Sequence, residues 1–196
     1  FHIEVNRQRS FEEAHELVES LRLAIENRIP TIYLVDSAGV FLPLQEDVFP
    51  DTDDFGRVFR NNAVMSAMGI PQTTAIMGMC VAGGAYLPVM CDHILMTEGS
   101  GLFLAGPALV QAAIGQKVSA EELGGAKVHA RTSGTIDFRE PDDDSCLRRL
   151  RALVDKFGRR PAAPFDHRPA EPPAYSAEEI YGIFTGQPGK QYDMRE

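Results

Sequence analysis

Apolar and polar residues follow a helical period in the first clear element of the chain. A capping box at residues 10–13, Ser-Phe-Glu-Glu, gives the signal for a helix start. Apolar residues then recur three and four positions apart until Asn27 and Pro30, which end the pattern. They are Ala14, Leu17, Val18, Leu21, Ala24 and Ile25. The spacing predicts one amphipathic helix.

Four apolar runs that are too short for helices predict buried strands. They are residues 31–35, 73–77, 93–97 and 102–105, the last two joined by a Glu-Gly-Ser-Gly turn. We expect the first run to be a central parallel strand covered on both faces, because it is apolar almost without interruption.

Helical patterns lie between these strands. They are residues 53–69, with Asp51 or Thr52 as the cap, residues 85–91, with Pro88 in the first turn, and residues 108–114, with Pro107 at the helix start. A strand is also expected at residues 128–132, after a short helix that a capping box at residues 119–122 begins. A last amphipathic helix begins at the acidic residues 142–144. This alternation is typical of the α/β class.

The character of the chain changes after Gly158. Residues 159–173 hold five prolines and little apolar content, which is typical of an extended linker, and a short helix begins near Ser176. We expect a domain at residues 1–158 that lacks its own N-terminus. Residues 159–196 are expected to be a linker and short helix that lead toward an absent C-terminal domain.

An Ala-Gly-Gly turn joins the strand at residues 73–77 to the helix at residues 85–91. Glycines at a helix start let a ligand approach the bare backbone, and the unpaired N–H groups there favour developing negative charge. Gly83 and Gly84 therefore predict an oxyanion hole built from main-chain donors.

Two other strand ends carry small residues. Residues 36–40 follow the first strand, and Gly106-Pro107 follows the fourth. Ligands gather at the carboxyl ends of parallel strands, so these turns are further candidates for backbone contacts. For residues 36–40, an ordinary strand-to-loop turn remains the alternative.

Composition excludes several classes of function. The 196 residues are 44% apolar and 24% charged, which is enough for one domain with a sizeable core. A formal net charge of −9 argues against a nucleic-acid partner, since such binding depends on neutralised phosphates. No apolar run reaches membrane-spanning length and no leader is seen, so we expect a soluble, unexported protein that does not bind a membrane.

The cysteines and acidic residues predict no metal site. Cys80, Cys91 and Cys146 are odd in number and lack Cys-x-x-Cys spacing, so we expect small buried hydrophobes. The acidic residues 51–54 lack the spacing of a calcium loop.

No general-base constellation is visible either. His129 is the histidine in a plausible core position, and we expect it to be a hydrogen-bonded structural residue. The chain has no Gly-x-Ser-x-Gly elbow. A site made mostly of backbone donors suits a reaction that places charge on a carbonyl oxygen, such as the conversion of a thioester to an enolate.

Several short segments occur in an order that is specific to one family. They are Ile-Tyr-Leu-Val-Asp-Ser at 32–37, Leu-Pro-Leu-Gln at 42–45, Val-Phe-Pro-Asp at 48–51, Phe-Gly-Arg at 55–57, Ala-Gly-Gly-Ala-Tyr at 82–86, Gly-Pro at 106–107, and the segments 118–126 and 128–134. Across about residues 20–196 the chain resembles the carboxyltransferase (β) subunit of biotin-dependent acyl-CoA carboxylases. The segments at 42–51 look closest to the methylcrotonyl-CoA and geranyl-CoA branch.

The resemblance implies a fold and a reaction. The fold is crotonase-like (ClpP/crotonase), an α/β superhelix of repeated β-β-α units. The reaction moves a carboxyl group from carboxybiotin to the enolate of an acyl-CoA thioester. Biotin is carried by a partner, the biotin carboxylase and biotin carrier subunit, and the full-length protein is a homo-oligomer without a catalytic metal. The location is cytoplasmic, or the mitochondrial matrix in a eukaryote.

The resemblance also implies roles for residues. The N–H groups of Gly83 and Gly84 become the donors to the thioester oxygen. The substrate-binding positions are Ser37, Ala38, Gly39, Val40, Ala82, Ala85, Ala105, Gly106 and Pro107. Ala38, Val40 and Ala105 depart from the smaller residues usual in the family, which indicates either a different acyl preference or subfamily drift.

Three alternatives remain open at the sequence level. A crotonase-type hydratase or isomerase would need carboxylates aimed at the thioester. A non-catalytic acyl-CoA-binding half-site would result if the other half of the active site is absent. A biotin-dependent acyl-CoA decarboxylase subunit would run the reaction in the opposite direction.

Overall fold

The computed structural model describes residues 11–39, 55–158, 171–172, 174–183 and 191. The capping box expected at residues 10–13, the cap expected before residue 55 and most of the expected linker lie outside the described residues. The chain divides into one compact unit of residues 1–157 and a second of residues 158–196. In the second unit, a 3-10 turn at Ala177–Glu179 leads into α9 (Ile180–Ile183).

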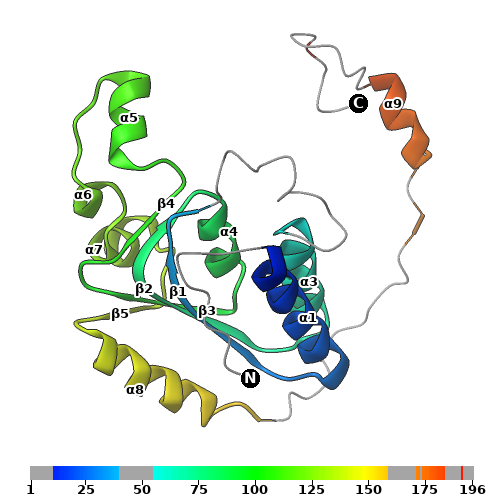
Figure 1. Ribbon diagram of the computed structural model, residues 1–196, viewed down its shortest axis with the longest axis horizontal. Helices are drawn as coiled ribbons and strands as arrows, with labels where there is room; N and C mark the ends of the chain where they lie inside the picture. The colour runs from blue at the N-terminus through cyan, green and yellow to red at the C-terminus, as the bar shows by residue number, and fades with distance from the viewer. Residues whose placement is uncertain (1–10, 40–54, 159–170, 173, 184–190, 192–196) are drawn as a thin grey trace. The chain divides into compact units, whose positions relative to one another are not determined.

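A parallel sheet forms the centre of the first unit (Figure 1). Its strand order is β1-β2-β3-β5, and β4 pairs with the last residues of β2. The strands are β1 (Thr31–Ser37), β2 (Gln72–Val81), β3 (His93–Thr97), β4 (Gly101–Phe103) and β5 (Phe138–Glu140). This agrees with the predicted α/β class.

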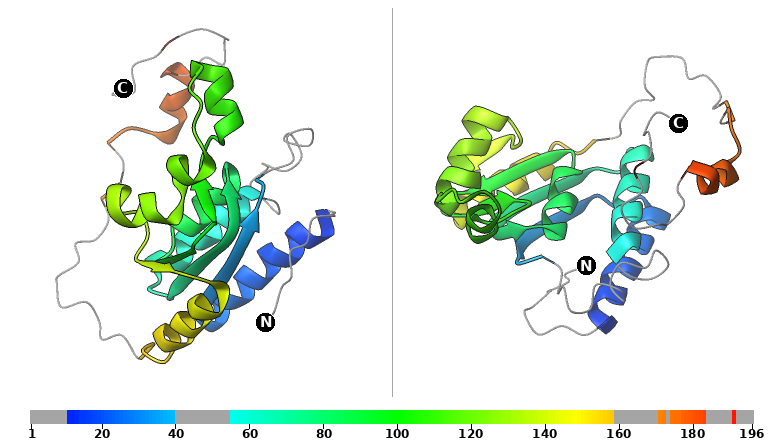
Figure 2. Two further views of the ribbon diagram at one scale, coloured as in Figure 1. Left: turned by 90° about the vertical axis from the view of Figure 1, so that its left-hand side faces the viewer. Right: turned by 90° about the horizontal axis from the view of Figure 1, so that it is seen from above.

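Helices cover both faces of the sheet (Figure 2). On one face, α1, α3 and α4 pack over residues such as Tyr33 and Ile76, and on the other face α8 packs over Ala75 and Leu95. Ala75 and Ile76 are neighbours in β2 and therefore point to opposite faces. The helices are α1 (Phe11–Asn27), α3 (Phe55–Ala67), α4 (Gly83–Val89), α5 (Pro107–Ile114), α6 (Ala120–Gly124), α7 (Ala126–Val128) and α8 (Asp143–Val154).

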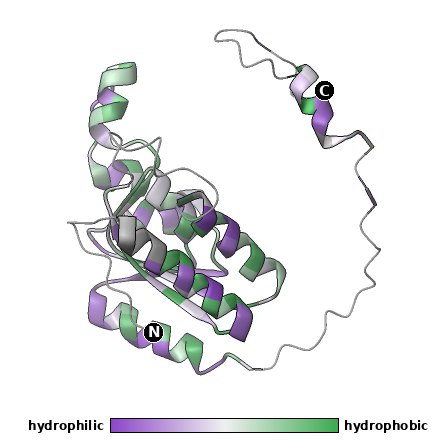
Figure 3. Cartoon of the chain, turned by 45° about the vertical axis from the view of Figure 1, so that its right-hand side comes forward, coloured by the Kyte–Doolittle hydropathy of each residue, from purple (hydrophilic) through white to green (hydrophobic). Residues whose placement is uncertain are grey.

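Figure 3 shows the hydropathy of the residues along these helices. Apolar and polar residues lie side by side in α1 and α8, as expected for helices with one buried face. In contrast, α5 has no buried residue, and its Leu109 and Ile114 are exposed. None of the helices in the described part of the chain is long and apolar enough to cross a membrane.

Several local predictions are confirmed. The expected strand at residues 93–97 is β3, and Pro107 is the first residue of α5. Ser119 and Glu122 form the expected capping box of α6, because the Ser119 hydroxyl accepts the Glu122 N–H while the Glu122 carboxylate accepts the Ser119 N–H. Gly69 has the positive φ of 69° expected just after a helix end.

The first predicted strand exists as β1 and is parallel to β2, but its predicted central position is wrong. Among the described strands β1 pairs with β2 alone and forms the edge of the sheet, and Ile32 and Leu34 are 43% and 55% exposed. An apolar run shows that a strand is suited to burial on both faces of the sheet. It does not show which strands the neighbouring helices will cover. Here α8 covers β2 and β3 instead.

Two other predictions fail around short segments. Residues 128–132 are helical, with α7 running into a π-helical turn at His129–Ser133, because the His129 ring bonds within that turn and to Leu102. Pro88 lies inside α4 rather than in its first turn, since the helix begins two residues earlier than expected.

The N-cap of α8 gives a pH-dependent prediction. Bonds from the Ser145 hydroxyl and from its N–H hold the pKa of Asp142 below its usual value. The N–H donates to Asp142 Oδ1 over 2.7 Å. A depressed folded-state pKa means that this stabilisation is present above the unfolded pKa of about 4 and is lost as pH falls through the folded pKa.

We therefore expect Asp142→Ala to lower the melting temperature near neutral pH, with the difference from wild type shrinking as the pH falls below the unfolded pKa of about 4. Thermal unfolding followed by circular dichroism across this range measures the difference. Asp142→Asn is the control, because asparagine is also a good N-cap and does not titrate. A gap that stays constant with pH would contradict the assignment.

Candidate functional site

The ends of β1 and β2 meet at one place in the sheet. Ser37, the last residue of β1, pairs with Cys80 in β2. Both strands end in turns just beyond that pair. Ala38 and Gly39 follow β1, and Ala82 and Gly83 follow β2. The Ser37 hydroxyl accepts the Gly39 N–H over 3.2 Å, which holds the first turn closed.

The two turns are in close contact, and glycine makes this possible. A Cβ added to Gly84 would lie 2.6 Å from Ser37 Oγ and 3.1 Å from Ser37 Cβ. A Cβ added to Gly39, which has a φ of +90°, would lie 2.7 Å from the Val81 carbonyl oxygen. Residues 37–39 and 81–84 of the two predicted segments therefore lie against each other.

Ala82 adopts a backbone conformation that is unfavourable for a residue with a side chain. Its φ is 53° and its ψ −125°, a region that costs an alanine about 1–3 kcal/mol. Two backbone bonds hold it there: the Ala82 N–H donates to Phe103 O at 3.1 Å, and the Ala85 N–H donates to Ala82 O at 3.0 Å. The sharp turn ends β2 and starts α4 within one residue.

The turn leaves two main-chain donors available. Gly83 and Gly84 are the first two residues of α4, so their N–H groups have no intrahelical acceptor. No acceptor among the described residues bonds either group. Two adjacent N–H groups at a helix start are suited to a carbonyl oxygen that gains negative charge.

The third predicted segment is linked to the same turn. Phe103, whose carbonyl accepts the Ala82 N–H, ends β4 and is followed by Ala105, Gly106 and Pro107. Gly106 is the N-cap of α5 and its carbonyl accepts the Leu109 N–H at 3.0 Å. The bond between Phe103 and Ala82 therefore links the end of β4 to the turn that follows β2. The predicted position Val40 lies outside the described residues.

Cys80 supports the turn from beneath, a role that sequence reasoning missed. Its Sγ lies 3.2 Å from the Gly84 carbonyl oxygen and donates to it. Pro88, four residues after Gly84, has no N–H to offer that carbonyl, so the thiol replaces the missing helical bond. Burial, with a smaller contribution from the Asp36 carboxylate, raises the pKa of Cys80 to about 12 and keeps it protonated.

Cys146 is buried as predicted, whereas Cys91 is less buried than predicted. All three are free, Cys80 and Cys146 are buried, and Cys91 is half-buried. Burial raises the pKa of Cys91 to about 12 and that of Cys146 to about 11. The part of the chain that the structure describes contains no group of three or more His, Cys, Asp or Glu side chains arranged for a metal.

His129 is a structural residue, as predicted. Its Nε2 lies 2.7 Å from the Leu102 carbonyl oxygen, and its Nδ1 lies 2.9 Å from Ser133 Oγ. A carbonyl only accepts, so Nε2 carries a proton and donates it to this bond. Both ring nitrogens are engaged, and the ring ties the π-helical turn to β4.

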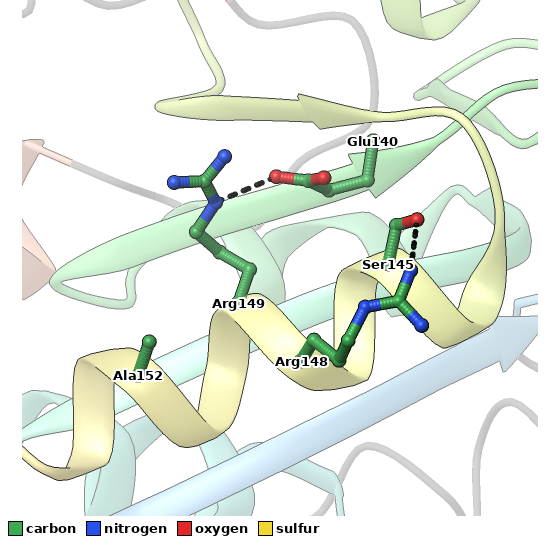
Figure 4. Close-up of a pocket in the computed structure, with 5 residues that line it drawn as sticks. All are labelled: Glu140, Ser145, Arg148, Arg149 and Ala152. Carbon is green, nitrogen blue, oxygen red and sulfur yellow. Dashed lines mark hydrogen bonds and ion pairs between the residues drawn. The ribbon is translucent and has the colours of Figure 1, made fainter.

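A separate pocket of about 370 Å³ lies between β5 and α8, on the face of the sheet opposite α4 (Figure 4). Arg149 Nε donates to the buried Glu140 carboxylate over 2.7 Å, while Arg148 Nη2 donates to Ser145 Oγ over 2.8 Å. The two guanidinium groups point to separate partners and do not converge on one ligand. None of the predicted site residues lines this pocket.

Comparison with known proteins identifies close relatives. A model of the carboxyl transferase domain matches residues 5–196. The biotin-dependent 3-methylcrotonyl-coenzyme A carboxylase beta1 subunit of Mycobacterium tuberculosis is 49% identical over 175 residues, which is 89% of this chain and 33% of that protein. The chain therefore spans about a third of the length of the curated relatives it matches.

Solved structures agree. The beta subunit of geranyl-CoA carboxylase from P. aeruginosa has a TM-score of 0.66 and 32% identity over 96% of this chain and 38% of its own. Transcarboxylase 12S, solved with hydrolyzed methylmalonyl-coenzyme A, has a TM-score of 0.69 and 27% identity over 95% of this chain and 36% of its own. The fold is crotonase-like, as the sequence predicted.

Proposed function

Because the chain belongs to the carboxyl transferase domain family, we propose that it forms the acyl-CoA-binding part of the carboxyltransferase component of a biotin-dependent acyl-CoA carboxylase. The component moves a carboxyl group from carboxybiotin to the enolate of an acyl-CoA thioester. The observation that carries this proposal is the pair of adjacent N–H groups at Gly83 and Gly84, which no acceptor in the described part of the chain bonds.

The two N–H groups act on the thioester carbonyl. Loss of a proton from the α carbon, or from the vinylogous γ carbon, moves negative charge onto the thioester oxygen. Donors held in place before the reaction stabilise this charge more than they stabilise the neutral thioester, which lowers the barrier. Ser37 and Ala82 fix those donors, because Gly84 packs on Ser37 and Ala82 sets the direction of α4.

The reaction needs a proton acceptor, and carboxybiotin supplies one. Bound carboxybiotin would supply carbon dioxide for attack by the enolate, together with a ureido nitrogen that could take the proton from the acyl group. His129 offers no free base, because both of its ring nitrogens are engaged in hydrogen bonds.

A hydratase or isomerase mechanism is less well supported. Such enzymes need a carboxylate aimed at the thioester, and Asp36 is the carboxylate next to the turn in sequence. Its Oδ1 accepts the Met79 N–H at 3.0 Å, and as the residue before Ser37 it leaves β1 on the opposite side.

Further parts of the proposal concern the longer protein. We propose that residues 1–158 hold the acyl-CoA and that residues 159–196 lead to a domain which contacts carboxybiotin. The threefold greater length of the relatives supports this division. A biotin carboxylase with its carrier domain is the proposed partner, in a homo-oligomer located in the cytoplasm or, in a eukaryote, the mitochondrial matrix.

The test is a reconstituted reaction. The full-length protein with its biotin carboxylase and biotinylated carrier is expected to form carboxylated acyl-CoA only when ATP and bicarbonate are present, as mass spectrometry of the products measures. The isolated chain is expected to bind acyl-CoA in calorimetric titration without turning it over. A hydrated product formed without bicarbonate, or turnover by the isolated chain, would overturn the proposal.

A further inference from the structure

Asp36 lies where β2 changes its neighbours. Val35 pairs with Ile76, whereas Ser37 pairs with Cys80, so β2 passes residues 77–79 while β1 passes Asp36 alone. Before this point β2 pairs with β3, whose Met96 is opposite Ile76, and beyond it β2 pairs with β4. The extra residues form a bulge, and bulges of this kind bend a strand where it turns a corner.

The Asp36 carboxyl group lies against the bulge, although Asp36 is exposed. Its Oδ1 accepts the Met79 N–H, a group that the bulge removes from the ladder with β1. A Cβ added to Gly78 would lie 2.3 Å from Asp36 Cγ and 2.3 Å from Oδ1, so glycine at this position leaves the space that the carboxylate occupies. The bond and the tight packing fix one conformation of the bulge.

The bulge determines where the Ala-Gly-Gly turn lies. Only Cys80 and Val81 separate Met79 from Ala82, so a change in the bend of β2 moves the start of α4. The segment from Gly78 to Gly84 is held at both ends by β1. Asp36 packs on Gly78, and Ser37 packs on Gly84. The carboxylate thus controls one end of the segment that carries the donors.

We propose that Asp36 is a positioning residue for the thioester site, holding the bulge of β2 so that the N–H groups of Gly83 and Gly84 meet the thioester oxygen. This inference rests on the function proposed above for that turn. It assigns a role to the acid of the Asp-Ser-Ala-Gly turn that involves no contact with the substrate.

The test compares Asp36 with a matched carboxylate at the other end of β2. Asp92 Oδ2 accepts the Gln72 N–H over 2.8 Å, so Asp92→Ala removes the same kind of bond from the same strand. In the full-length enzyme, Asp36→Ala is expected to lower kcat about 10- to 100-fold while the KM for acyl-CoA changes less than about threefold. Asp92→Ala is expected to lower the melting temperature similarly and to leave kcat within about twofold.

Two more variants sharpen the comparison. Asp36→Asn keeps an oxygen acceptor for the Met79 N–H and is expected to restore kcat to within about threefold of wild type. Gly78→Ala keeps the carboxylate but displaces it, so it is expected to lower kcat about 10- to 100-fold as well. This variant tests the proposal if Asp36→Ala does not fold. Equal kcat losses in Asp36→Ala and Asp92→Ala would contradict the proposal, because they would show that Asp36 only stabilises the fold.

A readout independent of activity separates this inference from the proposed function. Hydrogen–deuterium exchange in the full-length protein is expected to speed up in the peptide of residues 79–85 for Asp36→Ala and Gly78→Ala, but not for Asp92→Ala. Unchanged exchange in that peptide would overturn the positioning role whether or not the wild type carboxylates an acyl-CoA. An inactive wild type with altered exchange in the variants would overturn the proposed function alone.

Discussion

Gly84→Ala in the full-length enzyme is expected to lower kcat for carboxylation about 10²- to 10³-fold, the loss seen when an oxyanion donor is removed. The added methyl group would lie 2.6 Å from Ser37 Oγ and 3.1 Å from Ser37 Cβ, so α4 must move away from β1. Alanine favours helical backbone, and Gly84 lies within α4, so the effect is steric rather than conformational. Steady-state kinetics with acyl-CoA and the biotin partner measure it.

Two controls isolate the contact. Gly158→Ala adds a methyl group that meets nothing within 4 Å and is expected to leave kcat unchanged. Adding Ser37→Gly to Gly84→Ala removes both atoms that clash and should recover part of the lost activity. A Gly84→Ala enzyme with wild-type kcat would show that this N–H does not contact the reacting thioester.

Gln72→Leu is expected to lower the free energy of unfolding by about 3 kcal/mol or more, because it leaves several buried polar groups without partners. Gln72 is fully buried, and its Oε1 accepts from the Tyr33 hydroxyl and from Asn62 Nδ2, each at 3.0 Å. Its Nε2 donates to the Asn62 carbonyl oxygen and to Ser66 Oγ, each at 2.9 Å. Urea unfolding followed by circular dichroism gives the difference.

The network also supplies the control. Tyr33→Phe removes one donor and is expected to cost about 1 kcal/mol. Combined with Gln72→Leu, it should add less than its own cost, since the hydroxyl has then already lost its partner. Burial raises the pKa of Tyr33 well above its usual value, so the hydroxyl remains a donor throughout. A Gln72→Leu cost below about 1 kcal/mol would contradict the buried network.

The candidate site follows from sequence where its signals are local. Apolar runs identified β2 and β3, and the glycines of the Ala-Gly-Gly turn identified the start of α4, because a strand end and a helix start each leave a mark within a few residues. The small residues after β1 and β4 were predicted as separate turns. Their meeting depends on strand pairing, and the family resemblance supplied that link.

The features that tighten the site arise from contacts between distant residues. Asp36 reads as an ordinary turn residue, and only the register of β1 against β2 shows that its carboxylate caps Met79. The positive φ of Ala82 could not be predicted from its residue type, since glycine is the residue usually found in that conformation. The three-residue strand β5 and the π-helical turn at residues 129–133 are likewise stabilised by neighbours rather than by local propensity.

Pro88 and Cys80 are coupled through the Gly84 carbonyl oxygen. The proline withholds a helical donor, and the thiol from the neighbouring strand supplies one in its place. The two positions therefore form one thermodynamic unit, in which the effect of changing either residue depends on the identity of the other. A cysteine removed while the proline stays leaves a partly buried carbonyl without a donor, whereas a cysteine removed together with the proline lets the helix close its own bond.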